Sequence, residues 1–172
     1  KMNKVLLLSI LILITPLGAS TTEQESDILI YKNKRNLLFA APLVSYFKEF
    51  SAPNFMIAPH KIRTSNWRGY IATWEIIGDT LYLTDIDSYI CPTAEGDCER
   101  ATLQKIFGEK CINNKVKADW FNGELPIPDG KPLKFKGVYV LGTVYERELI
   151  LQVKAGQIVG SKIVDNRKRY KR

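Results

Sequence analysis

The chain has 172 residues, 45% of them hydrophobic, which fits one domain of ordinary size with a buried core. Its net charge is +7, but the excess lies at the ends. Removing the two lysines before residue 5 and the five bases of residues 167–172 from the 25 basic residues leaves 18, equal to the 18 acidic ones. A neutral body excludes the broad basic face that nucleic-acid binding needs, so we expect no nucleic-acid partner.

Residues 1–19 have the pattern of a secretory signal peptide. Lys4 precedes an apolar run at residues 5–14, and the small residues Gly18 and Ala19 follow. The run is too short for a membrane-spanning helix, which takes about 20 residues. We therefore expect export, to the periplasm or as a secreted protein, with cleavage after Ala19.

The mature chain is predicted to hold one β-rich domain, residues 20–166, followed by a basic tail, residues 167–172. The tail is short and has no apolar period. It is either a solvated terminus or a weak electrostatic contact with an anionic membrane or an acidic partner, contributing up to about 1 kcal/mol per basic residue.

The first predicted elements are short. Residues 27–40 read as two strands around the polar turn KNKR. The stretch PLVSYFKEF begins at Pro42 and spaces Leu43, Phe47 and Phe50 as on a helix. The stretch PNFMIAP is expected to be extended between its prolines.

A long hairpin is predicted next, at residues 70–87. Gly78-Asp79 suits a type II′ turn because glycine comes first. That turn pairs Ile77 with Thr80, and continuing the register pairs Trp74 with Leu83. Alternation then places one set of side chains in the core: Ala72, Trp74, Ile76, Leu81 and Leu83.

The second half predicts one helix and more strands. The stretch ATLQKIFGEK reads as a helix with Thr102 as N-cap and Gly108 at its end, and KVKADWF reads as a strand. Two hairpins are expected, around residues 128–130 and around Ala155-Gly156. The fold class predicted is α+β and β-rich, an antiparallel sheet or sandwich of about eight strands with two short helices.

Three cysteines follow the leader. The loop CPTAEGDC is rich in turn-forming residues, and an exported chain meets an oxidising compartment, so we expect a disulfide between Cys91 and Cys98. Cys111 is then either a buried small side chain or the true partner of one of the other two. A zinc site is disfavoured because His60 is the only histidine and the spacing matches no zinc motif. No metal or other cofactor is predicted.

Catalytic patterns are weak. His60 lies in APHKIR, without a nearby nucleophile motif, and reads as an exposed loop residue. Asp85 with Asp87, and Glu146 with Glu148, lie two residues apart on strands. Such pairs can serve acid/base catalysis across a cleft, but surface strands carry them routinely. An enzyme is therefore not favoured.

Aromatic residues are the better functional signal. The candidate binding residues are Trp67, Arg68, Tyr70 and Trp120, because aromatics offer large contact areas with a polar end and Arg68 could add a charged contact at the rim. The alternative is that the same residues fill a small β core.

The motifs NWRGYIATWEI, LYLTDID, ADWFNGEL and VYEREL, with ILIYKNKRNLLFAAPL before them, resemble a family of small uncharacterised bacterial proteins. The resemblance covers most of the mature chain and implies a shared single fold. It brings no activity, ligand or catalytic residue. The leader and the basic tail are not part of the shared pattern.

Taken together, the residues predict an exported, non-enzymatic binding domain whose partner is a protein or an envelope polymer such as a glycan. An inhibitor or immunity-type role fits this description. Two alternatives stay open: a small envelope hydrolase using carboxylates, and a structural accessory of the cell surface.

Overall fold

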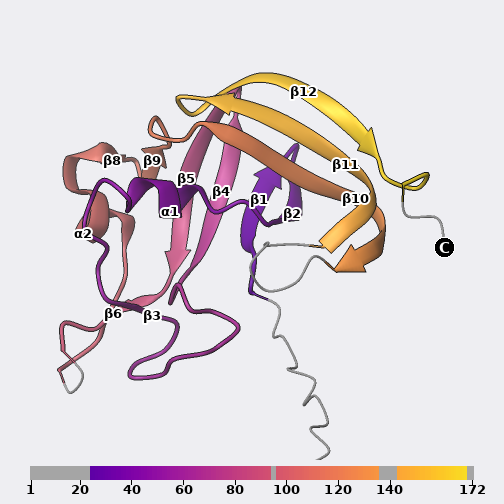
Figure 1. Ribbon diagram of the computed structural model, residues 1–172. Coiled ribbons are helices and arrows are strands. Elements are labelled where there is room, and N and C mark those ends of the chain that lie inside the picture. The colour runs from indigo at the N-terminus through magenta and orange to yellow at the C-terminus, as the bar shows by residue number, and fades with distance from the viewer. Residues whose placement is uncertain (1–23, 94–95, 136–142, 170–172) are drawn as a thin grey trace, which may run out of the picture.

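The computed structural model describes residues 24–93, 96–135 and 143–169 (Figure 1). The predicted signal peptide at residues 1–19 lies outside the described residues, as do positions 170–172 of the predicted tail. Across the described ranges, no helix is both long enough and apolar enough to cross a membrane.

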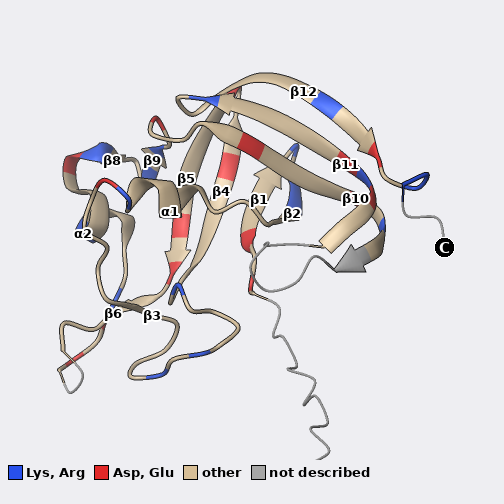
Figure 2. Cartoon of the chain, viewed as in Figure 1, with Lys and Arg blue, Asp and Glu red and all other residues tan. Residues whose placement is uncertain are grey.

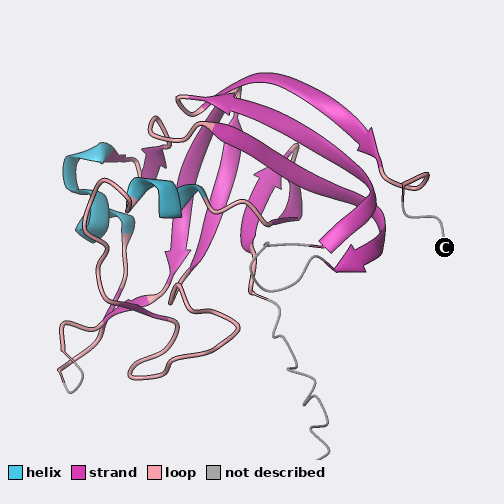
Figure 3. Cartoon of the chain, viewed as in Figure 1, coloured by secondary structure: helices cyan, strands magenta, loops and turns pink. Residues whose placement is uncertain are grey.

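The described chain is mostly strand, arranged as a nine-stranded sheet and a small three-stranded sheet (Figure 3). The main sheet contains β1 (Asp27–Tyr31), β2 (Lys34–Leu38), β4 (Ile71–Ile77), β5 (Thr80–Asp87), β8 (Cys111–Ile112), β9 (Lys115–Lys117), β10 (Gly123–Phe135), β11 (Thr143–Lys154) and β12 (Gln157–Asp165). The small sheet contains β3 (Phe55–Met56), β6 (Tyr89–Ile90) and β7 (Glu99–Arg100). The helices are α1 (Pro42–Tyr46) and α2 (Leu103–Phe107), with a 3-10 turn at Gly108–Lys110. The β-rich α+β class is confirmed.

The main sheet is mixed, not antiparallel throughout as predicted. Its order is β10-β11-β12-β5-β4-β1-β2, with β9 joined to β5 and β8, and β1 pairs with β4 in parallel. The reason is the long connection after β2: it carries the chain through α1 and β3 before β4 begins, and such a crossover lets two strands run in the same direction.

The β4–β5 hairpin confirms the predicted register. Ile77 pairs with Thr80 and Trp74 with Leu83, and only Gly78 of the two turn residues has positive φ, as a type II′ turn requires. The register shifts between Thr73 and Trp74, where β5 carries one extra residue. The predicted core face is confirmed, with Ile76 partly buried and the others fully buried: Ala72, Trp74, Leu81 and Leu83.

Two further hairpins form where the turn residues predict them. Lys32 and Asn33 join β1 to β2 with φ of 50° and 60°, and Ala155-Gly156 joins β11 to β12 with φ of 46° and 73°. Positive φ at both central residues makes these type I′ turns, whose twist suits a tight hairpin. The predicted cap of α2 is also present, since the Thr102 side chain accepts a hydrogen bond from the Lys105 amide.

The hairpin predicted around residues 128–130 is wrong. β10 runs through this stretch as one strand paired to β11, with register shifts between Asp129 and Pro132 and between Pro132 and Lys134. Gly130 has φ of 85°, and the Lys131 amide donates to the Glu146 carboxylate, so the turn residues form an irregularity within the strand. The prolines are tolerated because β10 is an edge strand of the main sheet.

The core lies between the arched strands β10–β12 and the strands β4, β5, β1 and β2 beneath them (Figure 1). Trp74 is fully buried, and its ring meets that of Trp120 edge to face at 6.5 Å. Charged residues of both signs are spread over the strands and loops and are not collected on one element (Figure 2).

Candidate functional site

The structure separates the four candidate binding residues. Trp67, Arg68 and Tyr70 line one hollow of about 260 Å³, while Trp120 lies apart, packed on Tyr46 with ring centroids 4.7 Å apart. Trp120 also donates its indole N–H to the Pro42 carbonyl at 3.0 Å, which holds α1 against the sheet. Trp120 is therefore a half-buried residue that packs in the interior, and it does not share a patch with Trp67, Arg68 and Tyr70.

Only one of the three grouped residues is strongly exposed. Trp67 is 66% exposed, whereas Arg68 is 8% and Tyr70 3% exposed. The expectation that Arg68 would sit at the rim does not hold, because its guanidinium group turns inward to Asp27.

Trp67 stands between two hollows, and Phe55 lines both with it. The second hollow measures about 160 Å³ and lies on the side of the exposed Ile62. We use the name Trp67 surface for Trp67 and six apolar residues that line the two hollows with it: Val44, Phe47, Pro53, Phe55, Met56 and Ile62.

The charged residues at these hollows are all basic. Lys48 lines one hollow and Lys61 the other, and no aspartate or glutamate lines either one among the described residues. Arg68, the third basic residue, is neutralised by Asp27. The rim of the Trp67 surface therefore has a net positive charge, which favours a partner with acidic groups.

The surface rests on a buried ion pair. Arg68 Nη1 lies 3.0 Å from Asp27 Oδ1, and its Nη2 donates to the Glu25 carbonyl at 2.7 Å. Asp27 also accepts hydrogen bonds from Trp74 Nε1 at 3.1 Å and from the Ala72 amide at 3.3 Å. Burial raises the pKa of Asp27, and the Arg68 charge and these hydrogen bonds lower it by less. The pair thus links β1 to the segment before β4.

Tyr70 forms the wall between the hollow and this pair. Its ring lies 5.0 Å from Arg68 Cζ and packs on Phe55 at 5.3 Å. Its hydroxyl is buried without a hydrogen-bond partner among the described residues. Burial, assisted by the nearby Asp27 carboxylate, raises the pKa of Tyr70 well above its usual value. Tyr70 is therefore neutral, and it packs against Phe55, which lines both hollows beside Trp67.

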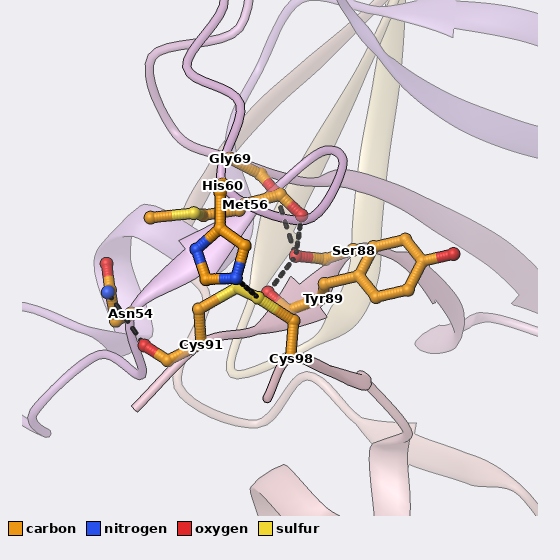
Figure 4. Close-up of a disulfide and its surroundings, with 8 residues drawn as sticks. All are labelled: Asn54, Met56, His60, Gly69, Ser88, Tyr89, Cys91 and Cys98. Carbon is orange, nitrogen blue, oxygen red and sulfur yellow. Dashed lines mark hydrogen bonds between the residues drawn. A yellow bond between two sulfur atoms is a disulfide. The ribbon is translucent and has the colours of Figure 1, made fainter. Parts of the chain in front are cut away.

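Gly69 allows the backbone next to Trp67 to approach β3. Its φ is 74°, and a Cβ built on it would lie 2.1 Å from the Phe55 carbonyl oxygen. The Gly69 carbonyl accepts a hydrogen bond from Ser88 Oγ at 2.7 Å (Figure 4). No residue but glycine fits this close contact.

The predicted disulfide is confirmed, and it supports the same region. Cys91 is bonded to Cys98, and Asn54 Nδ2 donates to the Cys91 carbonyl at 2.8 Å (Figure 4). The Cys91 amide in turn donates to the Asn54 carbonyl at 3.1 Å. Asn54 precedes Phe55, so the disulfide loop is tied to the Trp67 surface. His60, exposed as predicted, places Nε2 3.5 Å from the Cys98 sulfur. Cys111 is a free, partly buried thiol.

Replacing both Cys91 and Cys98 by serine is expected to lower the free energy of unfolding by about 2–3 kcal/mol, because the short loop is no longer closed in the unfolded chain. Urea denaturation of the oxidised protein and the double variant measures this. Cys111→Ser is the control, since it removes a thiol without removing a cross-link. Equal unfolding energies for the double variant and the parent protein would contradict the prediction.

The paired carboxylates do not meet across a cavity. Asp87 is bound to Arg100 at 2.8 Å on the surface, and Asp85 is exposed. Glu146 accepts from the Lys131 amide and Glu148 from the Asn166 side chain. Neither Asp85 nor Asp87 lines a hollow beside Trp67.

Sequence reasoning missed Asp27 and Phe55 as parts of this site. Asp27 opens a strand and reads as a surface residue, and Phe55 lies in a short segment between prolines. A signal for Asp27 exists only in hindsight: the strand that it opens is otherwise apolar, DILIY, so its carboxylate needs a buried partner.

No protein-family model, curated protein or solved structure matches this chain. No function, fold name or site residue is therefore transferred from a relative. The resemblance to small bacterial proteins depends on the sequence motifs alone.

Proposed function

We propose that the protein is an exported, non-enzymatic binding domain that holds its partner through the Trp67 surface. The observation that carries the proposal is the side chain of Trp67, which is 66% exposed between two hollows. Exposing a large aromatic side chain next to unfilled apolar hollows costs solvation free energy that a partner would recover.

The rigid base supports this reading. Arg68, Gly69 and Tyr70, the residues that follow Trp67, are buried and held by an ion pair, a close backbone contact and aromatic packing. A preorganised tryptophan loses little conformational entropy on binding, which is why such residues dominate the energetics of many interfaces.

The partner we propose is a protein or polymer that carries an apolar group for the hollows and acidic groups for Lys48 and Lys61. A disulfide is compatible with an oxidising compartment, and export is the part of the proposal that the leader sequence supports.

Trp67→Ala is expected to reduce partner binding by at least about tenfold, since a central tryptophan commonly contributes about 2 kcal/mol or more. The free energy of unfolding should change by no more than about 0.5 kcal/mol, because the side chain is mostly in solvent. The measurement is capture from an envelope extract by immobilised residues 20–172, read by mass spectrometry, with parent and variant baits at equal density.

Ile112→Ala is the matched control, because Ile112 is also a large apolar residue, 68% exposed, in β8. A partner retained by the parent and by the control but lost from the Trp67 variant supports the proposal. Equal retention by all three baits, or retention by none, contradicts it.

A further inference from the structure

A second cleft lies away from the Trp67 surface and is lined by residues of the β1–β2 hairpin and of β10, β11 and β12. Figure 1 shows how these three strands arch over the hairpin. The volume of the cleft is about 380 Å³, within the range of roughly 300–1,000 Å³ typical of small-molecule sites. It shares no residue with the hollows beside Trp67.

The floor of the cleft is a row of aliphatic side chains that crosses three strands. Ile127 of β10 pairs with Leu149 of β11, which pairs with Ile163 of β12. Directly paired residues project to the same face of a sheet, so the row is continuous. Ile163 is 74% exposed, although it lines the cleft, and Tyr31 faces the row from the hairpin. Ile127 is only 6% exposed and Leu149 is partly buried, so the uncovered apolar surface of the row is that of Ile163 and part of Leu149.

The neighbouring row on the arch is charged but internally compensated. Arg147 lies between its cross-strand partners Asp129 and Asp165 and binds Asp129 at 2.8 Å. Asp165 is held by Arg167. Glu148, which also lines the cleft, accepts a hydrogen bond from Asn166. Asn166 is neutral, so this side of the cleft offers no uncompensated positive charge and keeps one uncompensated negative charge, that of Glu148.

The β1–β2 hairpin forms the opposite side of the cleft, and its positive charges are not compensated. Lys32 and Lys34 both line the cleft, and neither has a carboxylate partner among the described residues. Lys32 Nζ lies 5.2 Å from the centre of the Tyr31 ring, so its charge stands directly beside the apolar part of the cleft. The hairpin side of the cleft thus supplies positive charge, and the floor supplies aliphatic surface.

We propose that this cleft binds a free amphiphilic carboxylate, a single hydrocarbon chain with one anionic head group. The chain lies on the row Ile127–Leu149–Ile163, and the head group lies at Lys32 and Lys34. Covering exposed aliphatic surface drives binding, and the two lysines select an anionic head. The small volume of the cleft suits one monomeric chain and not the surface of a bilayer.

The test is isothermal titration calorimetry of the full mature chain with three probes that share a ten-carbon tail: decanoate, decanol and decyltrimethylammonium. Saturable binding of one decanoate per chain is expected, with weaker binding of decanol and weaker still of the cation. Equal affinity for all three probes, or no saturable binding of decanoate, would overturn the proposal.

Variants locate the site. Lys32→Gln with Lys34→Gln should weaken decanoate binding about tenfold, as expected for the loss of two surface charge contacts, and leave decanol binding unchanged. Ile163→Asn should weaken the binding of both. The matched controls are Lys117→Gln with Lys154→Gln, and Ile112→Asn, all exposed positions outside the cleft. Equal decanoate affinity in cleft and control variants refutes the site. Binding to anionic lipid vesicles that the cleft variants alone abolish would refute the free monomeric ligand, because the cleft would then contact a bilayer surface.

Discussion

Asp27→Asn is expected to lower the free energy of unfolding by about 3–5 kcal/mol, the largest single-residue effect that we predict. The substitution keeps the shape of the side chain but removes its charge, which leaves the Arg68 guanidinium buried without a counterion. The Asp27 side chain is fully buried and that of Arg68 is 3% exposed, so water cannot replace the lost partner. Urea denaturation, monitored by tryptophan fluorescence, measures this free energy.

The control is Glu124→Gln, which breaks the exposed ion pair with Lys162 and should cost at most about 1 kcal/mol. A loss below about 1 kcal/mol for Asp27→Asn would show that water or another group reaches Arg68 and would contradict the buried pair.

The double variant Asp27→Leu with Arg68→Met should recover most of the loss. Burial raises the pKa of Asp27 more than Arg68 and the hydrogen bonds lower it, so desolvation dominates the energetics of the carboxylate. Replacing a buried ion pair by apolar side chains of similar size is often neutral or stabilising, whereas removing one partner is costly. A double variant as unstable as the single one would mean that the hydrogen bonds to Trp74 and Ala72, and not the charge, account for the loss.

Gly69→Ala is expected to give the second large effect and to act on the Trp67 surface as well. A left-handed backbone at a residue with a side chain costs about 1–3 kcal/mol, and the Cβ would in addition lie 2.1 Å from the Phe55 carbonyl oxygen. Because that oxygen is backbone, β3 must move, and Phe55 moves with it. We therefore expect a loss of more than about 2 kcal/mol in the free energy of unfolding, together with weaker partner binding.

Gly78→Ala separates conformation from contact. Gly78 has φ of 61°, but a Cβ there would meet nothing within 4 Å. In this control only the backbone conformation is unfavourable. Its free energy of unfolding should therefore fall clearly less than that of Gly69→Ala, and partner binding should be unchanged. Equal losses for the two variants in urea denaturation would show that the contact between Gly69 and Phe55 is unimportant.

Local patterns in the sequence were reliable where the structure is local. The type II′ turn at Gly78-Asp79 sets the register of β4 and β5, and alternation from that turn identifies the buried face. The start of α2 could be predicted because its cap is also local: the Thr102 side chain and the amide that it binds are three residues apart. The loop between Cys91 and Cys98 is likewise a short-range feature.

The same patterns failed where a distant strand competes. The stretch Pro128-Asp129-Gly130 has the residues of a turn, yet pairing with β11 continues on both sides of it and holds β10 as one strand. Arg68 reads as a rim residue because its neighbours are polar and aromatic. It is buried because Asp27, far away in the sequence, requires a counterion.

The sequence by itself determined the β-rich class, the three tight hairpins, the capped helix and the disulfide, because each depends on side-chain alternation or on contacts within a few residues. Only the tertiary structure decided which residues surround Trp67 and which line the second cleft. Phe55 reaches Trp67 across a glycine contact, and Ile127, Leu149 and Ile163 meet through pairing between separate strands. These contacts join segments whose approach depends on the free energy of the whole fold, which no local pattern encodes.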